Sequence, residues 1–219
     1  MMTDKLSELR DALDGLDNEM IALLVRRFEI SAQVAAAKNG DVTFRPGREA
    51  AILRRLQVSA PSLDPAMLLG IWRYIFTASV AQQKGNLRVA AHVGAGATAQ
   101  WHLANYVDVD IYEDANALLA SMLAGEFDYV FVPVAAGAQI GAFMMANDGL
   151  NIVAKTPFFE VPGLNPCYII GAHQADASEL DANIYAVAGD NGVKLVEDAG
   201  TPPVDLGGDN AKFIGKVAI

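Results

Sequence analysis

The sequence predicts a multi-domain protein, with an all-helical domain over residues 1–86 followed by a small α/β domain over residues 87–219. Two observations carry this prediction. Apolar residues recur every three or four positions before Gly85, whereas short apolar runs alternate with helix-like stretches after it. The charge divides at the same place: eleven bases face ten acids up to Gly85, and five bases face sixteen acids beyond it.

The overall composition excludes several classes of protein. The 219 residues are 53% hydrophobic and 19% charged, as in soluble globular proteins. A net charge of −10 gives no general attraction to nucleic acid or to an anionic membrane. The single cysteine cannot form an internal disulfide, the N-terminus carries acids in place of a signal peptide, and no apolar run approaches about 20 residues. A cytoplasmic protein is therefore expected.

Residues 4–38 are predicted to form one long helix, which Thr3 or Asp4 can cap. At about 1.5 Å per residue this helix is roughly 50 Å long, more than a small domain covers. A partner helix from a second chain is expected. The residues of its heptad-like seam are Leu6, Leu9, Leu13, Leu16, Met20, Leu23, Arg27, Ile30, Val34 and Lys38.

Two shorter helices are expected to complete the N-terminal domain. The stretch 39–47 contains the helix breakers glycine and proline, and an amphipathic helix is predicted over residues 48–58. Asp64 is placed to cap a third helix, with Pro65 in its first turn, that runs to about Lys84. The Lys-Gly-Asn sequence at 84–86 is the expected junction.

The second domain is expected to hold β/α units on a mostly parallel sheet. The predicted helices cover residues 98–107, 114–124 and 138–147. The predicted strands lie in the runs 87–93, 109–112, 129–134, 150–154 and 167–171, with weaker candidates at 184–188, 193–196 and 213–217.

Cations lie on the otherwise apolar seam of the first helix. Arg27 and Lys38 occupy seam positions, Arg10 lies beside the seam, and no acid occupies it. A cation removed from water costs several kcal/mol unless it is paired. Each side chain either extends to the surface or pairs with a carboxylate of the bundle, or together they hold a small dianionic ligand.

Six short motifs carry a resemblance to a known family. They are Leu-Arg at 9–10, Leu-Asp at 16–17, Leu-Leu-x-x-Arg at 23–27, Val-Ala-Ala-Ala-Lys at 34–38, Arg-Glu-Ala-Ala-Ile-Leu at 48–53 and Ser-Val-Ala-Gln-Gln at 79–83. In this order they resemble the AroQ-type, all-helical chorismate mutases over residues 4–84. The resemblance implies a three-helix fold in an intertwined homodimer, whose long first helices pack together.

The resemblance also implies an isomerase of the shikimate pathway, which rearranges chorismate to prephenate for aromatic amino-acid biosynthesis without a cofactor or metal. By position, Arg10 from the neighbouring chain and Arg27 match the arginines that hold the two substrate carboxylates. Lys38 and Gln83 match the pair that donates hydrogen bonds to the ether oxygen.

Three further positions match substrate contacts of the family. Glu49 matches the acid that binds the ring hydroxyl, Arg48 lies beside it, and Ser79 lines the pocket. Without the resemblance, Ser79 reads as an ordinary helix hydroxyl and Gln83 as a solvated helix end. The chain departs from the family at Arg45, where many members carry an acid. A related branch is an isochorismate-pyruvate lyase, but the intact Arg-Glu pair at 48–49 is more similar to the mutases.

The second domain resembles one lobe of prephenate dehydratase. The resemblance rests on Gly-Ala-Gly-Ala-Thr at 94–98, Val-Pro-Val-Ala-Ala-Gly at 132–137 and Pro-Cys-Tyr at 166–168. No arginine follows Arg88, so a degenerate domain without dehydratase activity is expected. The turn at 93–99 also resembles a dinucleotide fingerprint, as in a fused prephenate dehydrogenase, but only about 130 residues remain for it.

The role of the second domain, whether regulatory, structural or docking, stays open. Two alternatives to a simple mutase are a bifunctional chorismate mutase/prephenate dehydratase and a non-catalytic regulator of a shikimate-pathway enzyme. His92, His102 and His173 lack metal-ligand spacing and read as structural or exposed residues. Cys167 has no basic neighbour in sequence that would activate its thiol.

Overall fold

The computed structural model of the chain describes residues 2–37, 44–158, 160–200 and 210–219. Contacts divide the protein into two compact units, Met1–Thr43 and Phe44–Ile219. The second and third helices therefore belong to the same compact unit as the sheet. The functional boundary predicted at residue 86 marks the change from helical to α/β structure and stays a prediction.

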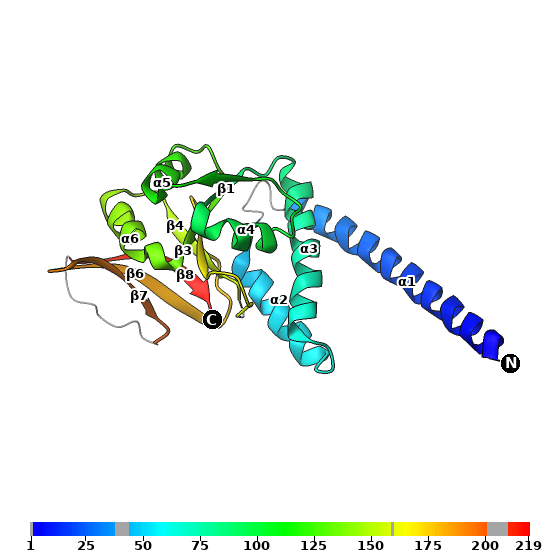
Figure 1. Cartoon of the computed structure of the whole chain (residues 1–219). Helices are drawn as coiled ribbons and strands as arrows, with labels where there is room; N and C mark the ends of the chain where they lie inside the picture. Colours follow the sequence, from blue (N-terminus) through cyan, green and yellow to red (C-terminus); the bar gives the residue numbers. More distant parts are fainter. Residues whose placement is uncertain (1, 38–43, 159, 201–209) are drawn as a thin grey trace. The chain divides into compact units, whose positions relative to one another are not determined.

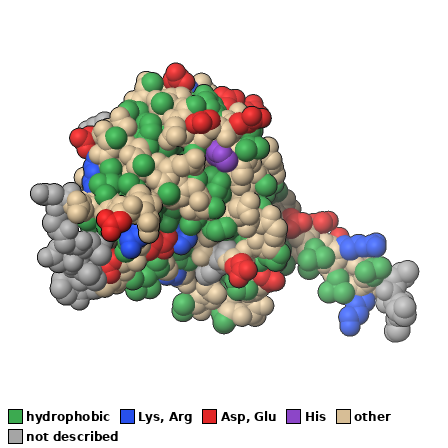
Figure 2. Space-filling model, turned by 60° about the vertical axis from the view of Figure 1, so that its left-hand side comes forward, with side chains coloured by type: hydrophobic (Ala, Val, Ile, Leu, Met, Phe, Trp, Pro, Cys, Tyr) green, Lys and Arg blue, Asp and Glu red, His purple; other side chains and the backbone are tan. Residues whose placement is uncertain are grey.

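The first unit holds one continuous helix, α1, Met2–Ala37 (Figure 1). Its apolar seam is exposed, with hydrophobic side chains on the helix surface beside charged ones (Figure 2). Leu13 is 60% exposed and Leu23 is 65% exposed. Tertiary packing stabilises most helices in water, so this uncovered stripe needs a partner surface. Among the described residues, no helix is long and apolar enough to cross a membrane.

Helices α2, Pro46–Ser59, and α3, Pro65–Lys84, open the second unit. They pack against each other through a small apolar cluster that includes Leu53, Leu69 and Phe76. The cap predicted for α3 is confirmed, because the carboxylate of Asp64 accepts a hydrogen bond from the backbone N–H of Ala66 at 2.7 Å. Proline occupies the first turn of both helices, where its missing N–H costs nothing.

The rest of this unit is built on an eight-stranded sheet in the order β2-β1-β3-β5-β4-β8-β6-β7. Its strands are β1 (Val89–His92), β2 (Val109–Tyr112), β3 (Tyr129–Pro133), β4 (Asn151–Thr156), β5 (Cys167–Gly171), β6 (Asp181–Gly189), β7 (Gly192–Asp198) and β8 (Ala211–Ala218). The expected strands are present, including the three weaker candidates.

The expectation of a mostly parallel sheet is wrong, because the sheet is mixed. β1 pairs in parallel with β2 and β3, and β4 with β8, but the other four pairings are antiparallel. A parallel pair needs a crossover, usually a helix, whereas consecutive strands without one can turn back as a hairpin. No helix separates β4 from β5 or β6 from β7.

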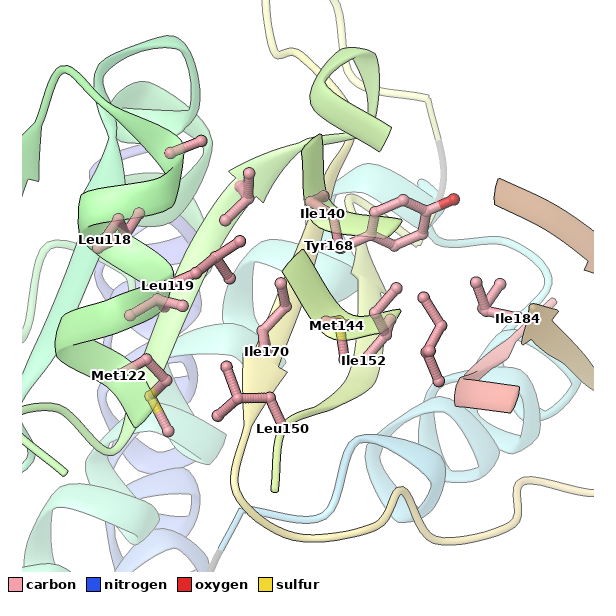
Figure 3. Packing of buried hydrophobic residues seen from close by; sticks show 14 of the residues in the cluster. Leu118, Leu119, Met122, Ile140, Met144, Leu150, Ile152, Tyr168, Ile170 and Ile184 are labelled. Atoms are coloured by element: carbon pink, nitrogen blue, oxygen red, sulfur yellow. The ribbon is translucent and has the colours of Figure 1, made fainter. Parts of the chain in front are cut away.

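Successive side chains of a strand point to opposite faces of the sheet, and a buried apolar cluster lies on each face. On β3, Val130 and Val132 join one apolar cluster, while Tyr129 and Phe131 join the other. Helices α5, Ala115–Leu123, and α6, Gly137–Ala146, cover the first face, with Leu118, Leu119, Ile140 and Met144 packed into it (Figure 3). Helix α4, Gly96–His102, adds Ala99 to the second cluster.

A residue far along the chain caps the N-terminus of α2. The carboxylate of Asp176 accepts hydrogen bonds from the backbone N–H of Gly47, at 3.1 Å, and of Arg48, at 3.2 Å. It also pairs with Arg45 Nε at 3.2 Å. The arginine that departs from the family pattern therefore has a structural partner within this unit.

Replacement of Gly47 by alanine is expected to destabilise the protein by about 1–3 kcal/mol, the usual cost of overpacking. A Cβ atom at Gly47 would collide with the backbone oxygen of Asp176. The matched control is Gly70→Ala in α3, where a Cβ meets nothing within 4 Å. That change is expected to stabilise by roughly 0.5–1 kcal/mol through helix propensity. Urea unfolding of both variants tests the pair, and equal effects would contradict the packing described.

Candidate functional site

Three ionisable side chains meet in the interior of the second unit. Glu49, Arg73 and His102 are 8%, 7% and 4% exposed. Arg73 Nη1 lies 2.8 Å from Glu49 Oε2 and 3.3 Å from His102 Nε2. On its other side, His102 Nδ1 lies 2.8 Å from the hydroxyl of Thr156. One guanidinium nitrogen thus contacts both the carboxylate and the imidazole.

The buried faces of three helices bring this trio together. Glu49 lies in the first turn of α2, one turn before the buried Leu53. Arg73 lies on α3, four residues after the buried Leu69 and three residues before the buried Phe76, so the three share one helix face. His102 is the last residue of α4.

Burial dominates the electrostatics of the trio. It lowers the pKa of Arg73, and the charge and hydrogen bond of Glu49 offset part of that shift, so the guanidinium stays protonated. Burial, and then the charge of Arg73, lower the pKa of His102 well below its usual value. The imidazole is therefore neutral at pH 7. Because Arg73 can only donate, the geometry assigns His102 an accepting Nε2 and a protonated Nδ1 that donates to Thr156.

The trio lines two open pockets, of about 380 Å³ and about 310 Å³, and both volumes include the open mouth of the pocket. Within the part of the chain that the structure describes, Arg73 Nε has no hydrogen-bond partner, so the pair with Glu49 does not use every donor of the guanidinium. The larger pocket is otherwise lined by Phe44, Thr77, Val80, Leu87, Val89, Leu103, Tyr129, Phe131 and Ile169.

The other cations predicted for the site are divided between the two units. Arg10 is exposed and Arg27 half-buried on α1, in the first unit. Lys38 lies outside the described residues. Arg48 has an exposed side chain on α2, in the second unit, and its backbone N–H donates to Asp176. Within the second unit, the structure brings Glu49 together with Arg73 and His102.

Ser79 and Gln83 lie in the last two turns of α3. Ser79 is buried, and its hydroxyl donates to the backbone oxygen of Ile75 at 2.7 Å, as an ordinary helix serine does. Gln83 is half-buried. Their roles as substrate contacts stay predictions.

Polar side chains in the segments that resemble prephenate dehydratase make hydrogen bonds to the backbone of this unit. Thr98 donates to the backbone oxygen of Asn165 at 2.7 Å, and Asn165 Nδ2 donates to the backbone oxygen of Gly94 at 3.2 Å.

Burial raises the pKa of the Cys167 thiol to about 11, which makes it a poor nucleophile at neutral pH. No group of three potential metal ligands occurs among the described residues.

Arg73 and His102 are site residues that the sequence interpretation missed. Arg73 carried a readable signal, because it occupies the apolar face of the 65–84 helix, as Arg27 does on the first helix. His102 carried no comparable signal, since its partners Arg73 and Thr156 lie 29 and 54 residues away in sequence.

Residues 9–84 match the family model described as chorismate mutase type II. The matched region holds most of α1 and all of α2 and α3, and it contains each predicted site residue from Arg10 to Gln83. No family match supports the dehydratase-like interpretation of residues 87–219. Neither a curated protein nor a solved structure matches the chain.

The buried neutral imidazole predicts a pH dependence of stability. Below about pH 6.5 the unfolded chain binds a proton at His102 that the folded protein, with its lowered pKa, does not, so the free energy of unfolding falls as pH decreases, by at most about 1.4 kcal/mol per pH unit. Burial opposes ionisation of Asp128 and Glu197, but surrounding hydrogen bonds and cations lower both pKa values. Their stabilising contributions are lost only at lower pH.

Urea titrations at several pH values check this expectation. His102→Gln is expected to remove the slope that the imidazole contributes, and His92→Gln, the same change elsewhere in this unit, is expected to retain it. An unchanged slope in His102→Gln would show that this imidazole titrates alike in the folded and unfolded protein.

Proposed function

We propose that the protein is a chorismate mutase, an isomerase that converts chorismate to prephenate in aromatic amino-acid biosynthesis. The observation that carries the proposal is the family match over residues 9–84. It includes the cations and the acid that the sequence interpretation assigned to substrate binding. A cytoplasmic location fits this activity.

The reaction is an intramolecular rearrangement that needs no nucleophile, metal or cofactor. The protein has to fold the enolpyruvyl side chain over the ring and stabilise the charge that develops on the breaking ether oxygen. Arg27 and Arg10 of the partner subunit bind the two carboxylates and so fix the reactive conformation. Lys38 and Gln83 donate hydrogen bonds to the ether oxygen, where they stabilise the transition state more than the ground state.

The remaining contacts orient the ring. Glu49 accepts a hydrogen bond from the ring hydroxyl, with Arg48 beside it, and Ser79 lines the pocket. An ionised carboxylate is a strong acceptor, and Glu49 Oε2 pairs with Arg73 Nη1 at 2.8 Å.

A homodimer completes the proposed site. The exposed seam of α1 supports this assembly, because Leu9, Leu13, Leu16 and Met20 are each more than half exposed in the single chain. Two such seams packed together remove this apolar surface from water. The same packing delivers Arg10 to the neighbouring subunit.

The full-length protein is expected to consume chorismate and form prephenate, which ultraviolet absorbance follows directly. Arg27→Ala and Lys38→Ala are each expected to lower kcat/KM by about 100-fold or more, because Arg27→Ala loses the contact that orients a substrate carboxylate and Lys38→Ala loses a donor to the developing charge. Arg26→Ala is the matched control, since Arg26 is exposed beside the seam, and it is expected to leave kcat/KM unchanged.

Absence of prephenate from the wild-type reaction would overturn the enzyme proposal and favour a non-catalytic regulator. The same reaction mixture separates the bifunctional alternatives. Phenylpyruvate would reveal dehydratase activity, and reduction of added NAD would reveal a dehydrogenase. Neither is expected.

Leu16→Asp is expected to weaken the dimer, because it places a charge in the centre of the apolar seam. The measured mass should fall toward that of the 23.2 kDa chain, and mutase activity should fall with it. Asn18→Asp adds the same carboxylate two residues away, off the seam, and should leave both properties unchanged. Light scattering coupled to size exclusion measures the mass. A wild-type protein that is monomeric and fully active would contradict the shared site.

A further inference from the structure

Residues 176–180 of the second unit hold helix α2 at two points, its N-terminus and Arg54. Asp176 caps its N-terminus through the backbone N–H groups of Gly47 and Arg48. About two turns further on, Arg54 donates to the backbone oxygens of Ser178, at 2.8 Å, and Leu180, at 3.2 Å. The helix that carries Glu49 is therefore not anchored by α3 alone.

The side chain of Glu49 is also connected to the sheet, through Arg73 and His102. Its carboxylate is held by Arg73 of α3, and the same guanidinium nitrogen contacts His102 of α4. The hydroxyl of Thr156, on β4, accepts from the other side of the imidazole. A chain of hydrogen bonds thus connects a central strand of the sheet to a predicted substrate contact.

Aromatic packing restricts the imidazole. The ring of His102 meets Phe131 edge-on, with centroids 5.4 Å apart, and Phe44 at 6.1 Å. Held by two rings and by Thr156, Nε2 presents a fixed acceptor to Arg73. A long arginine side chain has many rotamers, and a fixed acceptor selects among them.

We infer that His102 is a positioning residue for the mutase reaction, which orients Glu49 toward the substrate hydroxyl by fixing the guanidinium of Arg73. The inference rests on the proposed function. A buried ion pair contributes little net stability over an apolar replacement of the same volume. The polar side chains of the trio instead fix the orientation of the Glu49 carboxylate. Residues beyond the family match thereby take part in the mutase site.

The test measures kcat and KM for chorismate in the full-length protein and in three histidine variants. His102→Leu keeps the bulk but removes the acceptor, and it is expected to lower kcat/KM roughly ten- to hundredfold, mainly by raising KM. His102→Gln restores an acceptor and should recover much of the loss. His92→Leu makes the same change at a residue outside the trio and should behave as wild type.

A double-mutant cycle separates orientation from simple destabilisation. If His102 acts through Glu49, then adding His102→Leu to Glu49→Gln should cause little further loss of kcat/KM. Partial unfolding would lower kcat at unchanged KM and would add to the effect of Glu49→Gln. If His102→Leu does not fold, Thr156→Val decides, because release of Nδ1 should raise KM while an unchanged KM overturns the inference.

The outcomes distinguish the two proposals. A wild-type protein without mutase activity overturns the proposed function and the inference together. An active wild type whose His102→Leu variant retains wild-type kcat/KM, or loses kcat alone, overturns the inference only.

Discussion

The buried pair of Glu49 and Arg73 is the interaction around which the candidate site is built. Neither ion could remain charged in this interior alone, because removal of a charge from water costs several kcal/mol. Each compensates the other at 2.8 Å, and His102 accepts a further hydrogen bond from the guanidinium. The requirement to keep these three groups in register ties α2, α3 and α4 to one another and, through Thr156, to the sheet.

This constraint changes the expected relation between the helical part of the chain and residues 87–219. The sequence suggests a self-sufficient helical enzyme with an appended domain of unknown role. In the structure, α2 and α3 share one compact unit with the sheet, and Asp176 caps the helix that carries Arg48 and Glu49. Arg45, the departure from the family pattern, pairs with the same aspartate. These contacts join the N-terminus of α2 directly to residues beyond the family match.

Local patterns predicted the elements well and their assembly less well. The helix periods, the Asp64 cap and the strand runs depend on neighbouring residues, and most elements begin and end within a few residues of their expected places. The helix predicted over residues 98–107 is shorter than expected, because α4 ends at His102. The Glu49–Arg73–His102 trio depends on contacts between residues 24 or more positions apart. The antiparallel pairings of β3 with β5 and of β6 with β8 likewise join residues at least 24 positions apart. Arg73 was readable as a cation on an apolar face, but no local pattern identifies its partners. The seam of α1 predicted a need for a partner, which its exposure supports.

The protonation state of one ring tests the central interaction most directly. Nitrogen-15 chemical shifts of the His102 imidazole report which nitrogen carries the proton and whether the ring is charged. The hydrogen-bond geometry predicts a neutral ring at neutral pH, with the proton on Nδ1 and an unprotonated Nε2, and the lowered pKa predicts that the ring stays neutral at the pH where a free imidazole takes up a proton. A ring protonated at Nε2, or a cationic ring at neutral pH, would contradict the arrangement in which Arg73 donates to His102 and Glu49 alike.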